Sequence, residues 1–519
     1  MKQDKQTEND ARLFFDDILQ KTNFIEKLRS VTREVRDKLS QFDPRKTEKI
    51  TYPCEYLFTV ILLAGMAGFK SKHDVWMFWQ ANSDIFSEVF PDLFGEMPST
   101  STITRAQRLI ESDVLGDAIK EIMGRQYTCV RVCRKIYATE VLSMRDVLAC
   151  DGQAMRATAR LQPDGRRSGG KQITSIVSYE TGMTLGQVIH NKKNQEKQSI
   201  IDLAEDIDIS NTIMTWDAIN THPDLIEFAV SKKADVFASL KSNQGRTFEE
   251  IEYAYELYQK GEPLYRKPGH NATATDTVIS GSNHYNRHIV ALRAEDCMSK
   301  DILKKWPHIK TVAVIETESM NMVTGEVTNS LRYYITTLEM DLAKYPDFAR
   351  DLIDISLKRW CVETNHWHID RFFDQDQAAY ENDDAAFCNT IITKFTMSVF
   401  NFAKRAYAAE ELRYKGVCTT PRLQHACENI KFSALLLESF FKDDAKHLTQ
   451  DWLSRELKFM KEEEAEDRGY WPDPERYDHE PWPLQQFIEQ HKKRKKRKTG
   501  AFKNLRGSHS HLSQKSLYT

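Results

Sequence analysis

Between residues 147 and 241 the sequence alternates short apolar runs with amphipathic segments, and this alternation constrains the fold more than any other feature. Residues 147–151, 212–219 and 234–241 have the apolar pattern of buried strands. Residues 172–190 predict a hairpin with its turn at Glu180-Thr-Gly182. Amphipathic helices are predicted in between, from the segments EKQSIIDLAEDI and HPDLIEFAVSKK. The order strand, hairpin, helix, strand, helix, strand predicts a mixed α/β core.

The flanking sequence divides the rest of the chain into further expected domains. Residues 1–145 have helical periodicity, which predicts a helical N-terminal domain. Residues 246–345 contain β-like runs around polar loops, which predict a β-rich insertion. The α/β core is therefore split into residues 146–245 and 346–410, and residues 411–519 form a helical C-terminal extension with a basic tail.

Composition and charge narrow the class of protein. The chain has 519 residues, 40% of them hydrophobic and 29% charged, which is typical of a soluble protein with several domains. Its net charge is −3, so any attraction for nucleic acid must come from local patches. One such patch is the basic run Lys492–Lys498, which is equally consistent with a solvated tail, a localisation signal or non-specific phosphate binding.

The cysteines and the apolar runs bear on localisation. The nine cysteines are scattered and include no CxxC pair, which favours a reduced, cytoplasmic protein without a zinc site. The N-terminus is polar, unlike a signal peptide. The longest apolar run, Tyr56–Phe69, is shorter than the roughly 20 residues of a membrane-spanning helix and predicts a buried core helix. We therefore expect no membrane association and a cytoplasmic, nucleoid-associated location.

Three carboxylates stand where they would be costly to bury. Asp151 and Asp217 each follow an apolar strand-like run, and Glu363 lies in a predicted helix. Asp151-Gly152 also has the composition of a simple turn. Three acids that meet raise one another's desolvation cost, but they are good ligands for hard cations such as Mg²⁺. Two such ions can assist an in-line phosphoryl displacement.

The segment Arg359–Asp370 (RWCVETNHWHID) is predicted to be a helix with one charged face. Arg359, Glu363, His366 and Asp370 are spaced so that all four project from one side. We expect the tryptophans of this segment, Trp360 and Trp367, to anchor the helix to the core. The pattern Glu363-x-x-His366-x-His368 also resembles a zinc or di-iron ligand set, but di-iron bundles need Glu-x-x-His twice and only one copy occurs.

A series of short blocks identifies a family. In order along residues 40–405 they are FDPRK, PSTSTITR, ACDGQAMR, LGQVIHNKKNQ, TWDA, FASLKSNQ, RYYITTL and RWCVETNHWHIDRFFDQD. In these blocks the chain resembles the DDE transposases of bacterial insertion sequences, particularly the branch of the H-repeat-associated proteins of Rhs elements. The resemblance implies an RNase H-like catalytic core with Asp151, Asp217 and Glu363 as the metal-binding triad.

The resemblance extends less closely to the neighbours of Glu363. Arg359 matches the Arg of the Tyr-x2-Arg-x3-Glu-x6-Lys pattern of related transposases and is expected to contact DNA. The Tyr position holds Ser356 and the Lys position holds Asp370, so DNA contacts attributed to that Tyr and Lys are not carried over. We expect Asp370 to lie beside the metal ligands, and His366 either to orient Glu363 or to contact DNA.

Other candidate DNA contacts lie outside that helix. Lys241, Asn243 and Gln244 follow a predicted strand and match a family block that would contact phosphate near the metals, although a solvated loop explains them equally well. Arg105 lies in a predicted helix whose start is marked by Pro98 and a Ser/Thr cluster. That helix is either a recognition helix for the element ends or a core helix of the N-terminal domain.

Taken with the resemblance, these residues predict a DNA transposase that cleaves the ends of its element and joins them to target DNA. The expected cofactors are two Mg²⁺ (or Mn²⁺) ions, one of which activates the attacking water; the released 3′-hydroxyl then attacks target DNA. Expected partners are the terminal inverted repeats and target DNA, with a dimer on paired ends. The alternatives are a domesticated, transposase-derived DNA-binding protein and a structure-specific nuclease without strand transfer.

Overall fold

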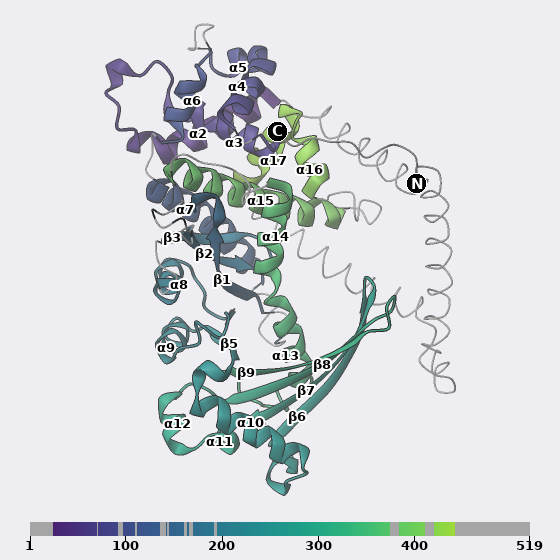
Figure 1. Cartoon of the computed structure of the whole chain (residues 1–519). Coiled ribbons are helices and arrows are strands. Elements are labelled where there is room, and N and C mark those ends of the chain that lie inside the picture. The colour runs from purple at the N-terminus through teal and green to yellow at the C-terminus, as the bar shows by residue number, and fades with distance from the viewer. Residues whose placement is uncertain are drawn as a thin grey trace, which may run out of the picture.

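The sheet at the centre of the molecule carries helices on both faces (Figure 1). The computed structural model describes residues 24–69, 71–91, 97–108, 112–134, 142, 145–159, 163, 165, 170–190, 195–373, 383–410 and 420–441. The basic run Lys492–Lys498 lies outside the described residues.

Nine strands form this sheet in the order β3-β2-β1-β4-β5-β9-β8-β7-β6. The strands are β1 (Val147–Met155), β2 (Lys171–Ser178), β3 (Thr184–His190), β4 (Ile213–Thr215), β5 (Asp235–Leu240), β6 (Asn271–Ser280), β7 (Asn283–Arg293), β8 (Thr311–Asn321) and β9 (Val327–Thr336). Strands β1, β4 and β5 are parallel, whereas all other neighbours are antiparallel. The predicted α/β class is therefore confirmed.

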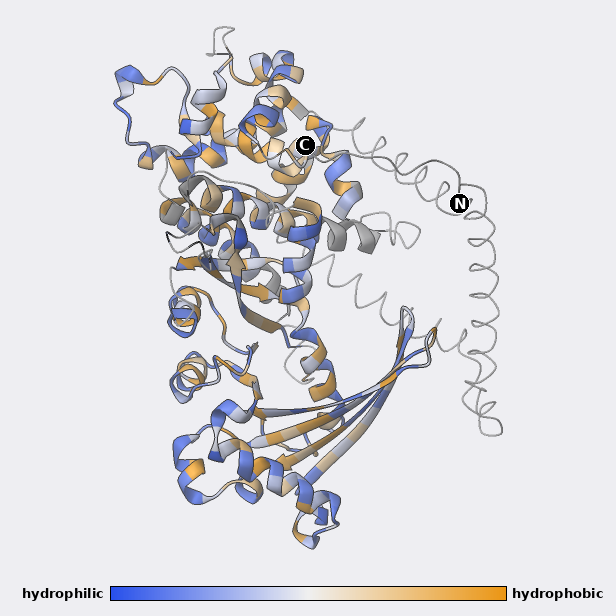
Figure 2. Ribbon diagram, in the orientation of Figure 1, coloured by the Kyte–Doolittle hydropathy of each residue, from blue (hydrophilic) through white to orange (hydrophobic). Residues whose placement is uncertain are grey.

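The predicted order of elements in the first part of the core is confirmed. The hairpin β2–β3 turns through Gly182, whose positive φ of 65° favours glycine. Helices α8 (Glu196–Glu205) and α9 (Pro223–Ser231) connect β3 to β4 and β4 to β5. Within β1, Val147 packs on one face of the sheet and Leu148 on the other. Because both faces are covered, these strands are continuous apolar runs rather than alternating ones (Figure 2).

The β-rich segment is hydrogen-bonded directly into this core. Strand β9 pairs with β5 from Phe237↔Thr336 to Leu240↔Tyr333, so β6–β9 extend the same sheet. The segment also contains helices that its strand-like runs did not predict, namely α10 (Arg246–Gln259), α11 (Ala294–Cys297) and α12 (Lys300–Lys305). Figure 1 shows β6–β9 as long, curved strands that project away from β1–β3.

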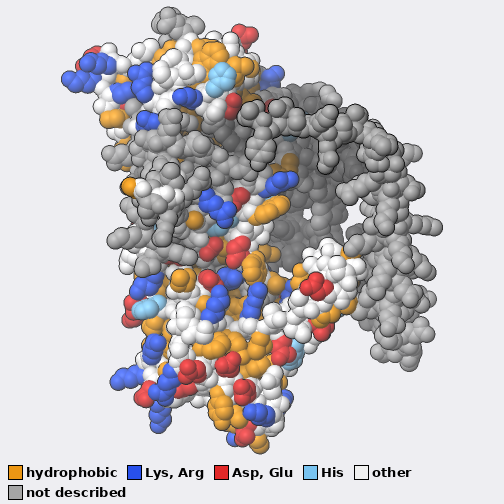
Figure 3. Space-filling view, in the orientation of Figure 1, with side chains coloured by type: hydrophobic (Ala, Val, Ile, Leu, Met, Phe, Trp, Pro, Cys, Tyr) orange, Lys and Arg blue, Asp and Glu red, His pale blue; other side chains and the backbone are white. Residues whose placement is uncertain are grey.

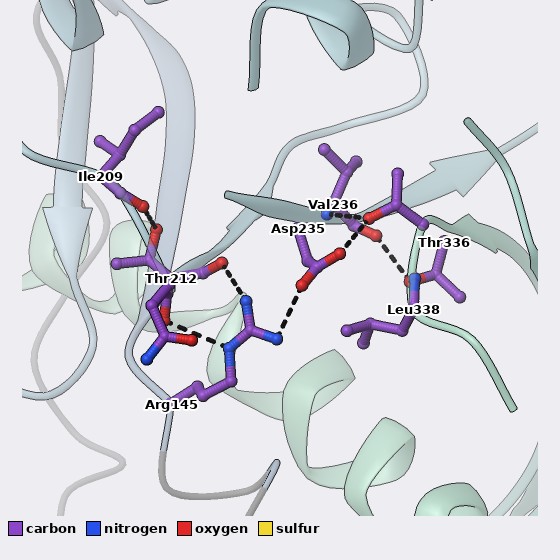
Figure 4. A network of polar contacts seen from close by, with 9 residues as sticks. Arg145, Ile209, Thr212, Asp235, Val236, Thr336 and Leu338 are labelled. Carbon is purple, nitrogen blue, oxygen red and sulfur yellow. Dashed lines mark hydrogen bonds and ion pairs between the residues drawn. The ribbon is translucent and has the colours of Figure 1, made fainter. Parts of the chain in front are cut away.

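A buried arginine joins the parallel strands to the end of β9 (Figure 4). The Arg145 guanidinium lies 2.7 Å from the Asp235 carboxylate and donates to the Thr212 carbonyl at 2.9 Å. Thr337 donates to the other oxygen of Asp235 at 2.7 Å, and Thr336 donates to the Val236 carbonyl at 2.6 Å. These bonds hold β4, β5 and β9 together, and a hydrogen bond to a charged group contributes about 1.5–3 kcal/mol.

Helices make up the described part of residues 24–134. They are α2 (Phe24–Leu39), α3 (Cys54–Met66), α4 (Lys72–Ala81), α5 (Ser83–Val89), α6 (Thr100–Ala106) and α7 (Ser112–Arg134). The apolar run that begins at Tyr56 forms the buried helix α3, as predicted. Ser99 caps α6 by accepting a hydrogen bond from the Thr102 amide, which confirms the predicted helix start. None of the described helices is long and apolar enough to cross a membrane.

The helices after the sheet return to both the core and the N-terminal helices. They are α13 (Phe348–Lys358), α14 (Cys361–Phe373), α15 (Asp383–Glu410), α16 (Thr420–Ala426) and α17 (Ile430–Phe441). Helix α14 packs on β1 and β2, α13 on β6 and β7, and α17 on α2. Gln126 of α7 donates to the Phe440 carbonyl, so α17 is hydrogen-bonded to the N-terminal helices as well.

Candidate active site

Asp151 lies in the middle of β1, opposite Ser175 of β2. The strand continues past it, so the alternative that Asp151-Gly152 forms a turn is wrong. A Cβ atom at Gly152 would lie 2.7 Å from a carboxylate oxygen of Glu196, the first residue of α8. Glycine therefore follows Asp151 because a second acid approaches the strand closely at this point.

Asp217 lies in the loop after β4, and residues after β5 hold that loop. The side-chain amides of Asn243 and Gln244 both donate to the Ala218 carbonyl, at 3.1 and 3.4 Å. The Lys241 ammonium is 3.3 Å from an Asp217 oxygen, and its side chain is 64% exposed. Asn243 and Gln244 thus hold the loop that carries Asp217 in place, and the Lys241 side chain is exposed to solvent.

Glu363 lies in the first turn of α14, just after a short break between two helices. The helix predicted over Arg359–Asp370 is confirmed from Cys361 onwards as α14, and its first two residues form the break after α13, which ends at Lys358. Arg359 lies in this break, with its side chain only 12% exposed and its guanidinium 3.5 Å from Glu363. The second carboxylate oxygen of Glu363 is buried and has no hydrogen-bond partner among the described residues.

The pKa values of these acids reflect their proximity. Burial raises the pKa of Asp151 to about 7, and the negative charges of Glu196 and Glu363 add to the effect. Burial also raises the pKa of Glu363; Arg359 opposes this increase and Asp217 adds to it. At Asp217 burial is outweighed by the Ala218 amide and the Lys241 ammonium, which lower its pKa. Acids from β1, the β4 loop and α14 are therefore within electrostatic range of one another.

His366 and Asp370, the other residues of the predicted charged face, also point towards β1. His366 Nδ1 is 3.6 Å from an Asp151 oxygen, and burial lowers the pKa of this histidine to about 3, so the ring is neutral. His366 is only 8% exposed and contacts Asp151, whereas its expected roles were to orient Glu363 or to contact DNA. The side-chain amide of Gln153 lies 3.3 and 3.4 Å from the two Asp370 oxygens.

The donor set suits a hard divalent cation. Carboxylate oxygens are the ligands that Mg²⁺ and Mn²⁺ prefer, and Mg²⁺ keeps several waters for substrate oxygens to replace. Burial is the main cause of the raised pKa values at Asp151 and Glu363, neighbouring acids add to it, and one Glu363 oxygen has no hydrogen-bond partner among the described residues. In the described part of the chain, however, no three His, Cys, Asp or Glu side chains are grouped closely enough to hold one ion together.

The tryptophans of the segment Arg359–Asp370 do not anchor it to the core, and that expectation is wrong. Trp360 and Trp367 are 39% and 57% exposed. The buried apolar residues of α14 are instead Val362, Ile369 and Phe373, which pack towards the sheet and α15. Large exposed aromatic rings next to a cluster of acids therefore need another explanation.

Arg105 is not brought to the acids. It lies near the end of α6, where its guanidinium is 3.2 Å from the Thr102 hydroxyl and 3.3 Å from the Ser101 carbonyl. Figure 1 places α6 among the N-terminal helices, well away from β1 and α14.

Two charged residues beside Asp151 were not predicted from the sequence. Glu196 is only 7% exposed and contributes the largest electrostatic increase to the pKa of Asp151. Lys394 of α15 is 1% exposed and donates to Ser175, and burial lowers its pKa to about 7. The sequence signal for Lys394 was a lone lysine within the largely apolar run 391–400. The signal for Glu196 was the glycine that directly follows Asp151.

Comparisons with known proteins agree on one family. Residues 142–399 match the family model described as "Transposase DDE domain". The chain is 22% identical over 415 residues to "Putative transposase YncI" of Escherichia coli O157:H7, covering 79% of this chain and 96% of the relative. It is 23% identical over 347 residues to "H repeat-associated putative transposase YhhI" of Escherichia coli K12, covering 66% and 84%.

A solved structure has a more distant likeness. A piggyBac transposase in a synaptic complex with hairpin DNA aligns with 85% of this chain and 84% of its own, at 11% identity. The TM-score of 0.35 is below the level at which two folds are called the same.

Proposed function

Residues 142–399 belong to the transposase DDE domain family, and we propose that the protein cleaves the ends of its DNA element and joins them to target DNA. The cleavage is hydrolysis of a phosphodiester, which leaves a 3′-hydroxyl on the element. In strand transfer that hydroxyl attacks a phosphodiester of the target, and the displaced target 3′-oxygen leaves with the proton. Neither step needs a covalent protein nucleophile.

One observation carries this proposal. Asp151, Asp217 and Glu363 come from a strand, a loop and a helix that are far apart in the sequence, yet each affects or is affected by the charge of another. A fold that needed these residues only for stability would gain by separating them, because each raises the cost of ionising its neighbours. Acids held this near one another are therefore better explained by bound cations than by stability, although no three described His, Cys, Asp or Glu side chains are close enough to hold one ion together.

Two Mg²⁺ or Mn²⁺ ions, when bound, would supply charge neutralisation at the phosphate and an activated water. Asp151, Asp217 and Glu363 are the residues that would hold them. Neutral His366 would steady Asp151 from the protein interior, and Asn243 and Gln244 keep the Asp217 loop in place. Asp370 lies behind this group, near Gln153.

We further propose that the core is RNase H-like. The antiparallel order β3-β2-β1 followed by the parallel strands β4 and β5 supports this assignment, with acids on β1, after β4 and on a later helix. In this proposal residues 146–245 and 346–410 form the core, 246–345 the insertion, and 1–145 a DNA-binding domain that includes Arg105. Two protomers would act on paired ends.

The test is cleavage of DNA that carries the terminal repeats of the element, in Mg²⁺ or Mn²⁺. Wild-type protein should nick at the repeat ends, and Glu363→Gln, which keeps the shape of the side chain but removes its charge, should lower the rate by at least about 10³-fold, as expected for a group that acts on the transition state. Trp367→Ser, on the exposed side of the same helix, is the matched control and should nick normally.

Each outcome identifies one of the alternatives. Repeat-specific binding without metal-dependent nicking would indicate a DNA-binding protein that has lost catalysis. Nicking without joining to a target would indicate a nuclease. Equal nicking by wild type and Glu363→Gln would show that Glu363 has no role in catalysis.

A further inference from the structure

A cleft opens beside Asp217, between β5, β9 and the turn from α13 to α14. Its lining includes Lys241 after β5, Arg332 on β9, and Arg359 and Trp360 in the turn. Figure 3 shows basic side chains gathered next to acidic ones over this part of the molecule. Strand β9 belongs to the insertion, so the insertion contributes a charged residue to the surroundings of the candidate acids.

Arg332 and Arg359 share the indole of Trp360. Their guanidinium carbons lie 5.0 and 4.9 Å from the centre of the Trp360 rings. A planar guanidinium that stacks on an aromatic ring keeps its N–H groups free at the edge to bind an anion. Two like charges held on one ring repel each other, so the arrangement is favourable only with an anion nearby.

The carboxylates of the described residues do not fully neutralise Arg332 and Arg359. Arg359 pairs with Glu363, yet its Nε is buried and has no hydrogen-bond partner among the described residues. Arg332 is exposed and contacts the phenol of Tyr334, and no described carboxylate forms an ion pair with it. Glu363 would also turn to a metal ion in the proposed reaction, which would leave both guanidinium groups to the substrate.

The cleft therefore favours an anion that can present two oxygens to one guanidinium group. Together with Lys241, the two arginines place three cations beside the two carboxylates Asp217 and Glu363. Phosphate oxygens match the fork of an arginine, which donates two parallel hydrogen bonds. Both arginines lie about as close to the Trp360 ring as cation–π contacts require, so the indole holds two guanidinium groups at this cleft.

We propose that Arg332, held on Trp360 beside Arg359 (already an expected DNA contact), binds a backbone phosphate adjacent to the one that is cleaved, and that strand β9 of the β-rich segment thereby takes part in substrate binding. This inference rests on the proposed function, because the strand bound here is the one presented to Asp217 and Glu363. Trp360 acts as a positioning residue: it fixes the two arginines without contacting the phosphate itself.

The test measures DNA binding without metal, so that catalysis does not enter. The full chain is titrated in EDTA into a labelled duplex that carries the terminal repeat, and the affinity is followed as a function of salt. Arg332→Ala should weaken binding roughly tenfold and reduce the slope of log K against log salt by about 0.9, the value for one lost phosphate contact. Arg332→Lys should keep the slope and lose part of the affinity, because it retains the charge but not the planar fork.

Two further variants separate the phosphate contact from a general loss of charge or structure. Trp360→Ala should weaken binding, and Arg332→Ala should add less in that background than alone, because the two residues act together. Arg266→Ala removes an arginine that stacks on Tyr258, 4.1 Å from its ring, outside the cleft, and should leave affinity and slope unchanged.

Unchanged affinity and slope in Arg332→Ala would overturn the inference, as would the failure of the wild type to bind the duplex. The proposed function fails on a different result, namely no metal-dependent nicking by wild-type protein. DNA binding that depends on Arg332, without any nicking, would support the phosphate contact and contradict the proposed cleavage reaction.

Discussion

Replacing Asp151 with asparagine should make the metal-free protein more stable at and above neutral pH. The side chain of Asp151 is 26% exposed, and its pKa is raised from an ordinary value of 3.8 to about 7 by burial and by the charges of Glu196 and Glu363. The folded protein therefore holds the Asp151 proton more tightly than the unfolded chain does. Asparagine keeps the shape of the side chain and removes the charge.

The sign and the size follow from that difference. Between the unfolded pKa of 3.8 and the folded pKa of about 7 the native state binds more protons, so wild-type stability falls as pH rises through this window. At about 1.4 kcal/mol per pKa unit the full cost is about 4 kcal/mol above pH 7. Relaxation around a charged site reduces such costs, and we expect the variant to gain about 1–3 kcal/mol.

The assay is urea denaturation in EDTA at a series of pH values. The advantage of Asp151→Asn should grow from about pH 4 to pH 7 and stay constant above it. Asp217→Asn is the control of opposite sign: the pKa of Asp217 is lowered, so its ionised form stabilises the fold and the variant should lose stability above about pH 4. Added Mg²⁺ should stabilise the wild type but not Asp151→Asn. Equal stability of wild type and Asp151→Asn at every pH would refute the reasoning.

Three further substitutions test the packing around the site by urea denaturation. Gly152→Ala places a Cβ atom 2.7 Å from Glu196 and should cost about 1–3 kcal/mol, most of which Glu196→Ala in the same chain should restore; a cost that persists in the double variant would point to the backbone instead. Arg145→Met leaves the Asp235 carboxylate without its guanidinium and should cost about 2–3 kcal/mol, less than a fully buried pair because Asp235 is 31% exposed. Trp367→Ser should change stability by less than about 0.5 kcal/mol, since the ring is 57% exposed; a larger loss would mean that Trp367 anchors α14 after all.

The parts of the fold that the sequence predicted are those set by local patterns. The strands around Val147 and Phe237 are apolar runs because both faces of the sheet are covered, and the hairpin is marked by its glycine turn at Gly182. The pairing of β9 with β5 was not predictable in this way, since it joins segments a long way apart and depends on which sheet edge is open.

For the site, the sequence singled out three acids but gave little information on the residues around them. Asp151 and Asp217 were singled out by their place after apolar runs, but the same pattern suggested a turn at Gly152, where the structure has an approaching Glu196. Lys394 lies under the site although it comes from a helix after the last strand, a contact that only the tertiary fold creates. Trp360 and Trp367 were expected to anchor their helix to the core, but both side chains are exposed.

The joining of β5 to β9 also orders the events by which the site is made. Residue 237 cannot pair with residue 336 until the ribosome has released the intervening hundred or so residues, and pairings between distant segments are intrinsically slow. Glu363 follows β9 in the chain, so its helix emerges later still. A nascent or truncated chain that ends within the insertion has Asp151 and Asp217 but no Glu363. We therefore expect Glu363 to join Asp151 and Asp217 late in synthesis, after all nine strands of the supporting sheet have been synthesised.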